Sequence, residues 1–293
     1  MAPGGGYGEI GLSLLRMAAP GPVVGPAAVR DFVTEMPMQA WRAAGYRLLS
    51  MIATDCPLCG GPSAGGRPCA GCLRDVAATM HAGQPRCPRC ALRLRAELCP
   101  CPDCARRSLP LAGTSAGFDY EAPGDMLISR YKVEKRLALA GPLADLILRA
   151  PGFPPGGGGA RDLAPGTVLV PIPSSRASLR RRGFNPAAEL ARALARRTGL
   201  PVRLGWLARS REGPKQSGLS REARLRMAPG GYACPAPIPP CPIALVDDVM
   251  TTGSTLHAAA LALRAAGAGR IVALVAARAP ADAAGTLAQY RLP

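Results

Sequence analysis

Residues 243–256 read IALVDDVMTTGSTL, and this stretch decides the class of fold that we expect. A continuous apolar run is followed by two adjacent carboxylates and then by a turn rich in hydroxyls and glycine. An unbroken apolar run predicts a strand buried on both faces, which is typical of parallel sheets. Residues 254–267 carry apolar side chains at helical spacing, and Gly267 closes the pattern. The stretch therefore predicts a strand, a short turn and a helix in succession.

The turn between this strand and helix has the chemistry of a phosphate site. Free N–H groups and the helix dipole converge at a helix N-terminus, and hydroxyls add further donors. Gly253 lets the backbone approach a ligand closely. Asp247 and Asp248 stand at the carboxyl end of the strand, where they can accept hydrogen bonds from ribose hydroxyls, directly or through Mg²⁺. An acidic helix cap would explain one of these Asp residues but not the whole run.

Other segments repeat the alternation of apolar strand and helix. Because strands that are apolar on both faces alternate with helices, we expect an α/β fold with a parallel sheet flanked by helices. The expected strands are TSAGFDY (114–120), TVLVPIP (167–173), IALVDDV (243–249) and RIVALVAA (270–277), and the expected helices lie within 127–150, 186–197 and 254–267.

Upstream of this α/β region, cysteines occur in C-x-x-C pairs. Four such pairs fall within residues 56–104, in two halves with nearly identical spacing. A C-x-x-C knuckle supplies two thiolates from one turn, and two knuckles complete a tetrahedral zinc site. Four knuckles therefore predict two structural zinc ions and an N-terminal double zinc ribbon. The predicted metal ligands are Cys56, Cys59, Cys69, Cys72, Cys87, Cys90, Cys101 and Cys104.

Several alternatives to this zinc arrangement stay open on the sequence. Disulfide or redox chemistry is the rival interpretation of the pairs, but no export signal accompanies them. The repeated spacing favours sequential pairing of the knuckles, although an interleaved pairing has the same ligands. Cys99 could replace Cys101 as a ligand.

Taken together, these motifs resemble the ComF family, competence-associated proteins that combine a double zinc ribbon with a type I phosphoribosyltransferase-like domain. Residues 243–256 are similar to the phosphoribosyl pyrophosphate (PRPP) signature of that fold, and residues 170–190, which contain RGFN at 182–185, are similar to the family's strand, loop and helix. Lys132 and the segment 209–224 add supporting matches. The resemblance covers about residues 38–280.

The resemblance implies roles for individual residues. Asp247 and Asp248 would be the catalytic carboxylates that face the ribose and its Mg²⁺. The 5′-phosphate and pyrophosphate would contact two loops, and a mobile loop with Gln216 and Arg224 would cover them. The residues implied in phosphate binding are Val249, Met250, Thr251, Thr252, Gly253, Ser254, Thr255, Ser174, Ser175 and Arg176.

Charge points to a polyanionic partner. The chain of 293 residues has 36 Lys and Arg against 19 Asp and Glu, a formal net charge of +17. Residues 176–226 alone hold 14 of the basic residues and three acidic ones. A basic stretch beside a phosphate cleft favours contact with the backbone of single-stranded DNA, for which Arg180, Arg181 and Arg182 are the candidates. The rival interpretation is an ordinary solvated helix face with an Arg-rich loop.

These observations lead to two functional hypotheses. In the first, which the resemblance implies, the protein assists natural transformation, binds PRPP or a related sugar phosphate and single-stranded DNA, and meets proteins of the DNA-uptake machinery. In the second, it is an active Mg²⁺-dependent phosphoribosyltransferase of nucleotide metabolism or salvage. Apolar runs are too short to span a bilayer, so a cytoplasmic protein is expected. We expect three regions: 1–36, disordered or preceding the true start; 37–110, a short helix plus the ribbons; and 111–293, the phosphoribosyltransferase-like domain.

Overall fold

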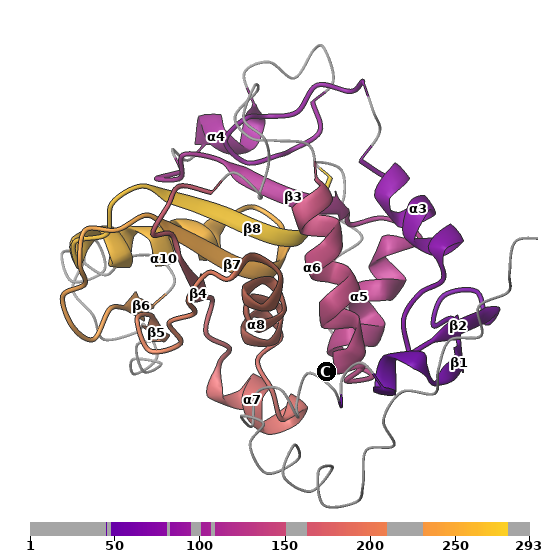
Figure 1. Cartoon of the computed structure of the whole chain (residues 1–293). Coiled ribbons are helices and arrows are strands. Elements are labelled where there is room, and N and C mark those ends of the chain that lie inside the picture. Colours follow the sequence, from indigo (N-terminus) through magenta and orange to yellow (C-terminus); the bar gives the residue numbers. More distant parts are fainter. Residues whose placement is uncertain are drawn as a thin grey trace, which may run out of the picture. The chain divides into compact units, whose positions relative to one another are not determined.

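Four strands form the parallel sheet at the centre of the fold. They are β3 (Thr114–Asp119), β4 (Val168–Pro171), β7 (Ile243–Met250) and β8 (Ile271–Arg278), in the spatial order β3-β8-β7-β4 (Figure 1). Every pairing in this sheet is parallel. The predicted α/β fold with a parallel sheet is therefore confirmed, and each of the four expected strands is present.

The computed structural model describes Gly45 and residues 48–80, 83–94, 101–106, 109–150, 163–209 and 231–280. The described residues from Ser50 onward belong to one compact unit, and the few before it belong to another. The expected N-terminal region 1–36, Cys99, Gln216 and Arg224 lie outside the described residues.

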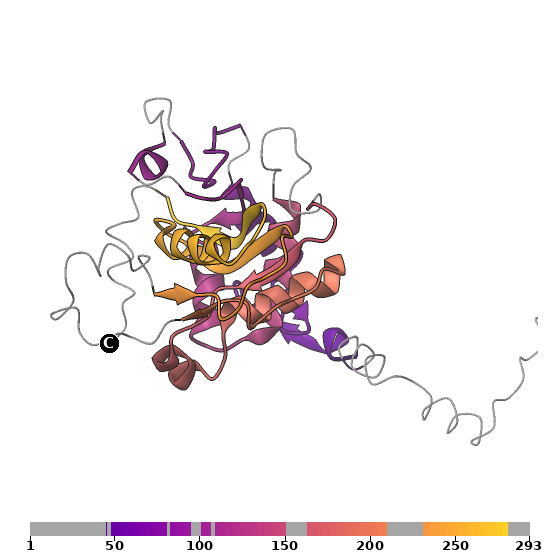
Figure 2. The same cartoon turned by 90° about the vertical axis from the view of Figure 1, so that its left-hand side faces the viewer.

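Helices cover both faces of the sheet because successive side chains, which point to opposite faces, are apolar along most of each strand. Ala244 and Val246 of β7 pack with α6 (Ala140–Arg149) and α8 (Pro186–Thr198) in one hydrophobic cluster. Ile243 and Leu245 point the other way, into a second cluster with α10 (Ser254–Ala265), which lies across the sheet in Figure 2. This two-sided burial is what the continuous apolar runs predict.

The helical segment expected within residues 127–150 is divided in two. Helix α5 (Gly124–Lys132) ends in a turn in which Lys135 has a φ of +56°, and a 3₁₀ turn, η2 (Leu137–Leu139), leads into α6. The apolar spacing persists across this break, so periodicity alone does not reveal it. The break leaves Lys132 at the C-terminus of α5.

The zinc-ribbon region supplies smaller elements. The first ribbon contains the hairpin β1 (Ala53–Asp55) and β2 (Pro62–Ala64), followed by α3 (Ala70–Ala78). The second contains α4 (Pro102–Arg106). Cys87, Cys90 and Leu92 of the second ribbon belong to the same buried cluster as Val275 of β8. The second ribbon is therefore packed onto the sheet.

Three further short elements follow β4 along the chain. Helix α7 (Arg176–Arg182) follows β4, in a segment that the sequence assigns to a loop, and none of its residues is buried. The short strands β5 (Ala208–Arg209) and β6 (Tyr232–Ala233) pair antiparallel.

Candidate functional site

The acidic pair lies on β7, one strand in from the β4 edge of the sheet. Asp247 and Asp248 are within the last four residues of the strand, which continues to Met250. Asp248 is buried, with an exposed fraction of 8%, and Asp247 is half-buried. The loops that follow β4 and β7 leave the same edge because the two strands are parallel neighbours. The structure thus brings together the two loops that the sequence assigns to phosphate groups.

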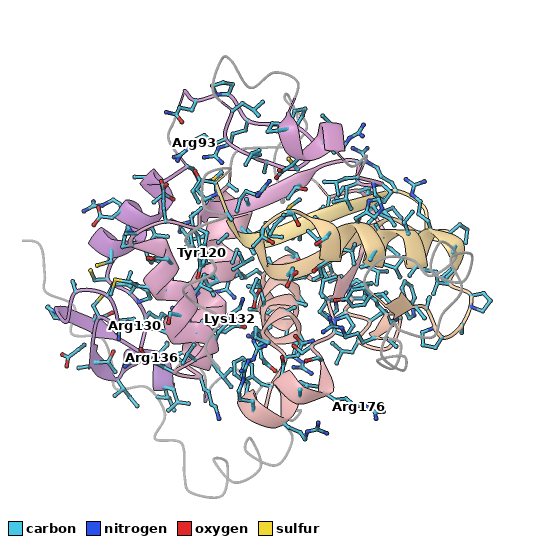
Figure 3. All side chains as sticks on the ribbon, turned by 180° about the vertical axis from the view of Figure 1, so that it is seen from behind. Arg93, Tyr120, Arg130, Lys132, Arg136 and Arg176 are labelled. Carbon is cyan, nitrogen blue, oxygen red and sulfur yellow. The ribbon has the colours of Figure 1, made fainter. Side chains whose placement is uncertain are left out.

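A lysine approaches this pair from a distant part of the sequence. Lys132 lies at the end of α5 (Figure 3), and its Nζ is 2.9 Å from Oδ1 of Asp248. Burial, together with repulsion from the Asp248 carboxylate, holds the pKa of Asp247 well above its usual value, and Lys132 offsets only part of this. Two adjacent carboxylates and one ammonium leave the site short of positive charge. Such a site is suited to a ligand that brings hydroxyl donors or a cation.

The turn after β7 presents an open helix N-terminus. Gly253 is the N-cap of α10 with a φ of +74°, and among the described residues no side chain caps this helix. Thr251 and Thr252 are exposed, and the Thr252 hydroxyl donates to Ser254 Oγ at 3.1 Å. The first amides of α10 and three nearby hydroxyls can therefore serve as donors to an anion.

A Cβ atom at Gly253 would lie 2.7 Å from Met250 Cε and 3.4 Å from Leu109 Cδ2. The positive φ favours glycine at this position, whereas the Met250 methyl group is the end of a flexible side chain.

The hydroxyls after β4 are already engaged in the structure. Ser175 caps α7 by accepting the amide of Ser178 at 3.1 Å, and Ser174 donates to Asn185 Oδ1 at 3.1 Å. Arg176 is exposed at the start of α7 (Figure 3). The pyrophosphate role implied for these residues stays a prediction. The geometry adds that Ser174 and Ser175 also shape the loop.

The RGFN segment holds this loop in place. Asn185 caps α8 by accepting the amide of Ala187 at 3.1 Å, and its Nδ2 donates to the Ile172 carbonyl at 3.0 Å. The Phe184 ring packs edge-on against Tyr131 of α5, with ring centroids 6.0 Å apart. RGFN therefore connects the end of β4 to the helix that carries Lys132.

The three arginines proposed for nucleic acid differ in their surroundings. Arg180 and Arg181 are exposed on the last turn of α7. Arg182 is half-buried, and its Nε is buried with no hydrogen-bond partner among the described residues. A buried donor left without a partner costs about 1–3 kcal/mol. Arg180 and Arg181 are thus placed to meet a ligand at the surface, whereas Arg182 is partly built into the fold.

The eight predicted cysteine ligands form two sets of four. The ligand atoms of Cys56, Cys59, Cys69 and Cys72 lie within 4.8 Å of one another, and so do those of the second set. The pairing is therefore sequential, and the interleaved alternative is wrong. The second set is Cys87, Cys90, Cys101 and Cys104.

Distances within the two sets fit zinc. Sulfur–sulfur separations are 3.8 Å for Cys59–Cys69 and 3.6 Å for Cys90–Cys101. A tetrahedral site with Zn–S bonds of about 2.3 Å has edges of about 3.8 Å, whereas a disulfide requires about 2.05 Å. Both sets of residues can therefore hold a zinc ion.

The pKa values of these thiols also indicate that a cation belongs between them. Burial and hydrogen bonds to neighbouring cysteines raise the pKa of Cys72. A hydrogen bond with Cys87 and burial raise the pKa of Cys90. Four packed thiols cannot all ionise unless a cation balances them. A divalent metal of the zinc type supplies that balance.

Sequence reasoning missed the charged residues that end two strands. Asp119 at the end of β3 and Arg278 at the end of β8 are strand partners in the sheet register, with exposed fractions of 0% and 1%. Asp119 accepts hydrogen bonds from both terminal guanidinium nitrogens of Arg86, at 2.9 and 2.8 Å. The sequence feature that could have identified them is a charged residue at the end of an apolar run, the same feature that points to Asp247.

Within the described part of the chain, no helix combines the length and apolar character that a membrane span requires.

Comparison with known proteins finds relatives with DNA-related names. The chain is 30% identical over 177 residues to DNA utilization protein YhgH of Salmonella typhi, covering 58% of this chain and 74% of the relative. The protein of the same name from Escherichia coli K12 is 29% identical with the same coverage. Competence protein F of Haemophilus influenzae is 27% identical over 208 residues, which cover 68% of this chain and 85% of the relative. No sequence profile of a protein family matches the chain.

The two cysteine sets predict the metal content of the protein. Purified full-length protein should contain two zinc ions per chain, and serine at Cys72 or Cys104 should remove one of them. Zinc should be lost as the pH falls, because protonation of the thiolates competes with the metal. Elemental analysis after dialysis at stepped pH checks this. Mass spectrometry that finds disulfides between the knuckles instead of metal would contradict the zinc assignment.

The raised pKa of Asp247 predicts a variant that is more stable than the native chain. Above about pH 4 the folded state binds more protons at Asp247 than the unfolded state, so stability falls as pH rises toward the folded-state pKa. Asp247→Asn should therefore increase the free energy of unfolding by about 1 kcal/mol or more at pH 9, and by less at about pH 6. Urea unfolding measures both values.

The matched control for this variant is Asp75→Asn, on the exposed surface of α3. It should have the same small effect at both pH values. If Asp247→Asn instead lowers the free energy of unfolding at the higher pH, the pKa of Asp247 is not raised in the folded protein.

Proposed function

The chain belongs to the ComF family of competence-associated proteins, and on this basis we propose that it binds PRPP, or a related ribose 5-phosphate ligand, and single-stranded DNA during the use of incoming DNA. The observation that carries the ligand proposal is the Asp247–Asp248 pair, with Lys132 beside it, next to the open N-terminus of α10. The relatives named for DNA utilization and for competence support the DNA context.

The proposed ligand matches the site group by group. The 5′-phosphate would accept hydrogen bonds from the amides and hydroxyls at Thr251–Thr255, where the helix dipole favours negative charge. The ribose hydroxyls would donate to Asp247 and Asp248. Lys132 holds Asp248 in place and contributes positive charge to an otherwise acidic edge. When bound, Mg²⁺ would supply the charge that lets a pyrophosphate approach two carboxylates.

Catalysis is the second candidate for this site, and the same observation favours it. Transfer of a phosphoribosyl group requires stabilisation of an oxocarbenium-like ribose and of departing pyrophosphate, which carboxylates and cations provide. The residues at hand for these roles are Asp247, Asp248 and Lys132. Binding without turnover and binding with turnover therefore differ only in the fate of PRPP.

The proposed DNA surface is helix α7 and its surroundings. Its exposed arginines, Arg176, Arg180 and Arg181, lie on a helix without buried residues. A surface hollow of about 390 Å³ adjoins it, lined in part by Leu179, Phe184 and Leu204. Cations beside exposed apolar groups suit a single strand, whose phosphates and unstacked bases are both accessible.

Isothermal titration of PRPP with and without Mg²⁺ tests the ligand proposal. Wild-type protein should bind PRPP more tightly with Mg²⁺, and Asp248→Asn should weaken binding about tenfold or more, because Lys132 and the ribose lose an anionic partner. Pyrophosphate release in the same samples separates catalysis from binding. Wild-type protein that binds no PRPP under either condition would refute the proposal.

Fluorescence anisotropy with an oligo-dT probe tests the DNA proposal. Binding should weaken steeply with salt, and the double variant Arg180→Gln/Arg181→Gln should lower the slope of log K against log salt by about 1.4, as expected for two lost phosphate contacts. The matched control is Arg264→Gln/Arg270→Gln, which removes two exposed arginines elsewhere. Equal losses in the two double variants would mean that only net charge matters, and the α7 assignment would be wrong.

A further inference from the structure

Arg278 makes an unusual set of contacts for a fully buried arginine. Its Nε donates to the Cys90 carbonyl at 2.9 Å, and its Nη2 donates to the Asp103 carboxylate. Its Nη1 donates to the carbonyls of Thr251 and Ala279, the latter at 2.6 Å, and the Met250 carbonyl lies 3.3 Å from the same nitrogen. A buried guanidinium is tolerated only when its donors find acceptors of this kind. The partners of Arg278 come from two separate parts of the molecule.

One set of partners belongs to the second four-cysteine cluster. Cys90 is a member of that cluster, and Asp103 lies inside the Cys101–Cys104 knuckle. Nη2 of Arg278 also lies 3.9 Å from Cys90 Sγ. Four thiolates around a divalent zinc ion leave a net negative charge, which a neighbouring guanidinium balances.

The other set of partners belongs to the phosphate loop. Met250 and Thr251 are the residues at which β7 turns toward α10, and Ala279 next to Arg278 donates its amide to the Met250 carbonyl at 2.9 Å. Leu109, in the chain leaving the second ribbon, lies against the site of Gly253. The phosphate loop is therefore contacted by residues that lie next to the second ribbon.

We propose that Arg278 is a positioning residue that couples metal binding at the second four-cysteine cluster to the conformation of the phosphate loop. With metal bound, the knuckles hold the Cys90 carbonyl and Asp103 against the guanidinium, which in turn fixes the Met250 and Thr251 carbonyls. Without metal these acceptors move away, and the buried charge loses its partners on one side. Only the ligand-binding arm of the test rests on the proposed PRPP site.

A neighbouring charge pair offers a comparison within the same interface. Asp119 also links the second ribbon to the sheet through two ion pairs. Its Oδ2 lies 2.8 Å from Nη2 of Arg86 and 3.3 Å from Nη1 of Arg93, which is labelled in Figure 3. Its contacts run to the ribbon and to Thr79 Oγ1, which accepts the Asp119 amide at 3.0 Å. Asp119→Asn therefore weakens the same docking without touching the phosphate-loop carbonyls.

Hydrogen exchange in ligand-free, full-length protein tests the coupling. The amides of Ala279 and His257 bond to the carbonyls of Met250 and Gly253, so their exchange reports the loop. Cys104→Ser, which removes the second zinc, should speed their exchange by about tenfold or more. Cys72→Ser removes the first zinc and is the matched control, with exchange close to wild type. Equal exchange in the two variants, with one zinc lost from each, would overturn the proposal.

PRPP titration of Arg278→Lys tests the residue itself. Lysine keeps the charge but cannot reach all of the acceptors, so this variant should keep both zinc ions and bind PRPP about tenfold more weakly. Asp119→Asn should lose thermal stability and keep the wild-type affinity for PRPP. An Arg278→Lys variant with wild-type affinity and wild-type exchange at Ala279 and His257 would overturn the proposal.

A second variant and a readout that is independent of PRPP cover the cases in which Arg278→Lys does not fold or PRPP does not bind. If Arg278→Lys fails to fold, Asp103→Asn, whose side chain is 23% exposed, weakens the same link more gently and should speed exchange at Ala279. If wild-type protein binds no PRPP, the proposed ligand is wrong, while the exchange comparison of Cys104→Ser with Cys72→Ser still decides the coupling.

Discussion

The buried charges at the carboxyl edge of the sheet are the constraint on which the rest of this structure depends. Arg278 and Asp119 are neighbours across β8 and β3, and each needs a further partner of opposite charge besides its neighbour in the sheet. Asp103 and Arg86 of the second ribbon are these partners. Breaking one partner of such a buried pair typically costs about 3–5 kcal/mol, so the ribbon and the sheet stabilise each other. The second four-cysteine cluster thereby becomes part of the edge at which the candidate site lies.

These contacts link the second ribbon to the edge of the sheet at which the acidic pair lies. Under the proposed coupling, a metal-bound ribbon would hold the turn after β7 through two side chains, the guanidinium of Arg278 and Leu109. On the other side of the acidic pair, Lys132 approaches from α5, and the contact of Tyr131 with Phe184 ties that helix to the segment after β4. Lys132 therefore supports the acidic pair, while Arg278 and Leu109 contact the turn that follows it. Two carboxyl groups held this close share a proton until the pH exceeds the raised pKa of Asp247 or a cation arrives.

The strands and the cysteine ligands are predictable from the sequence because each leaves a local pattern. A buried parallel strand has to be apolar on both faces, and a zinc knuckle has to place two thiols one turn apart. The turn after β7 has a local pattern too, since Gly253 needs a positive φ and a helix must begin directly after it. The break between α5 and α6 escapes prediction because apolar spacing continues through Lys135. Helix α7 escapes it because its residues bury nothing and show no apolar face.

By itself the sequence determined the α/β class and the two sets of four cysteines, because both follow from spacing along the chain. It also predicts a ligand site at the acidic pair and the turn after β7. Tertiary structure decided what spacing cannot express, which is the identity of partners far apart in the sequence. The tertiary structure shows that the knuckles pair sequentially and that Lys132 forms an ion pair with Asp248. It also shows that Arg278 donates hydrogen bonds to the carbonyls of both Cys90 and Thr251. The reason is physical: a charge that loses its water on folding must find its partner wherever the packed chain brings one, and that place is fixed only when the layers of the fold come together.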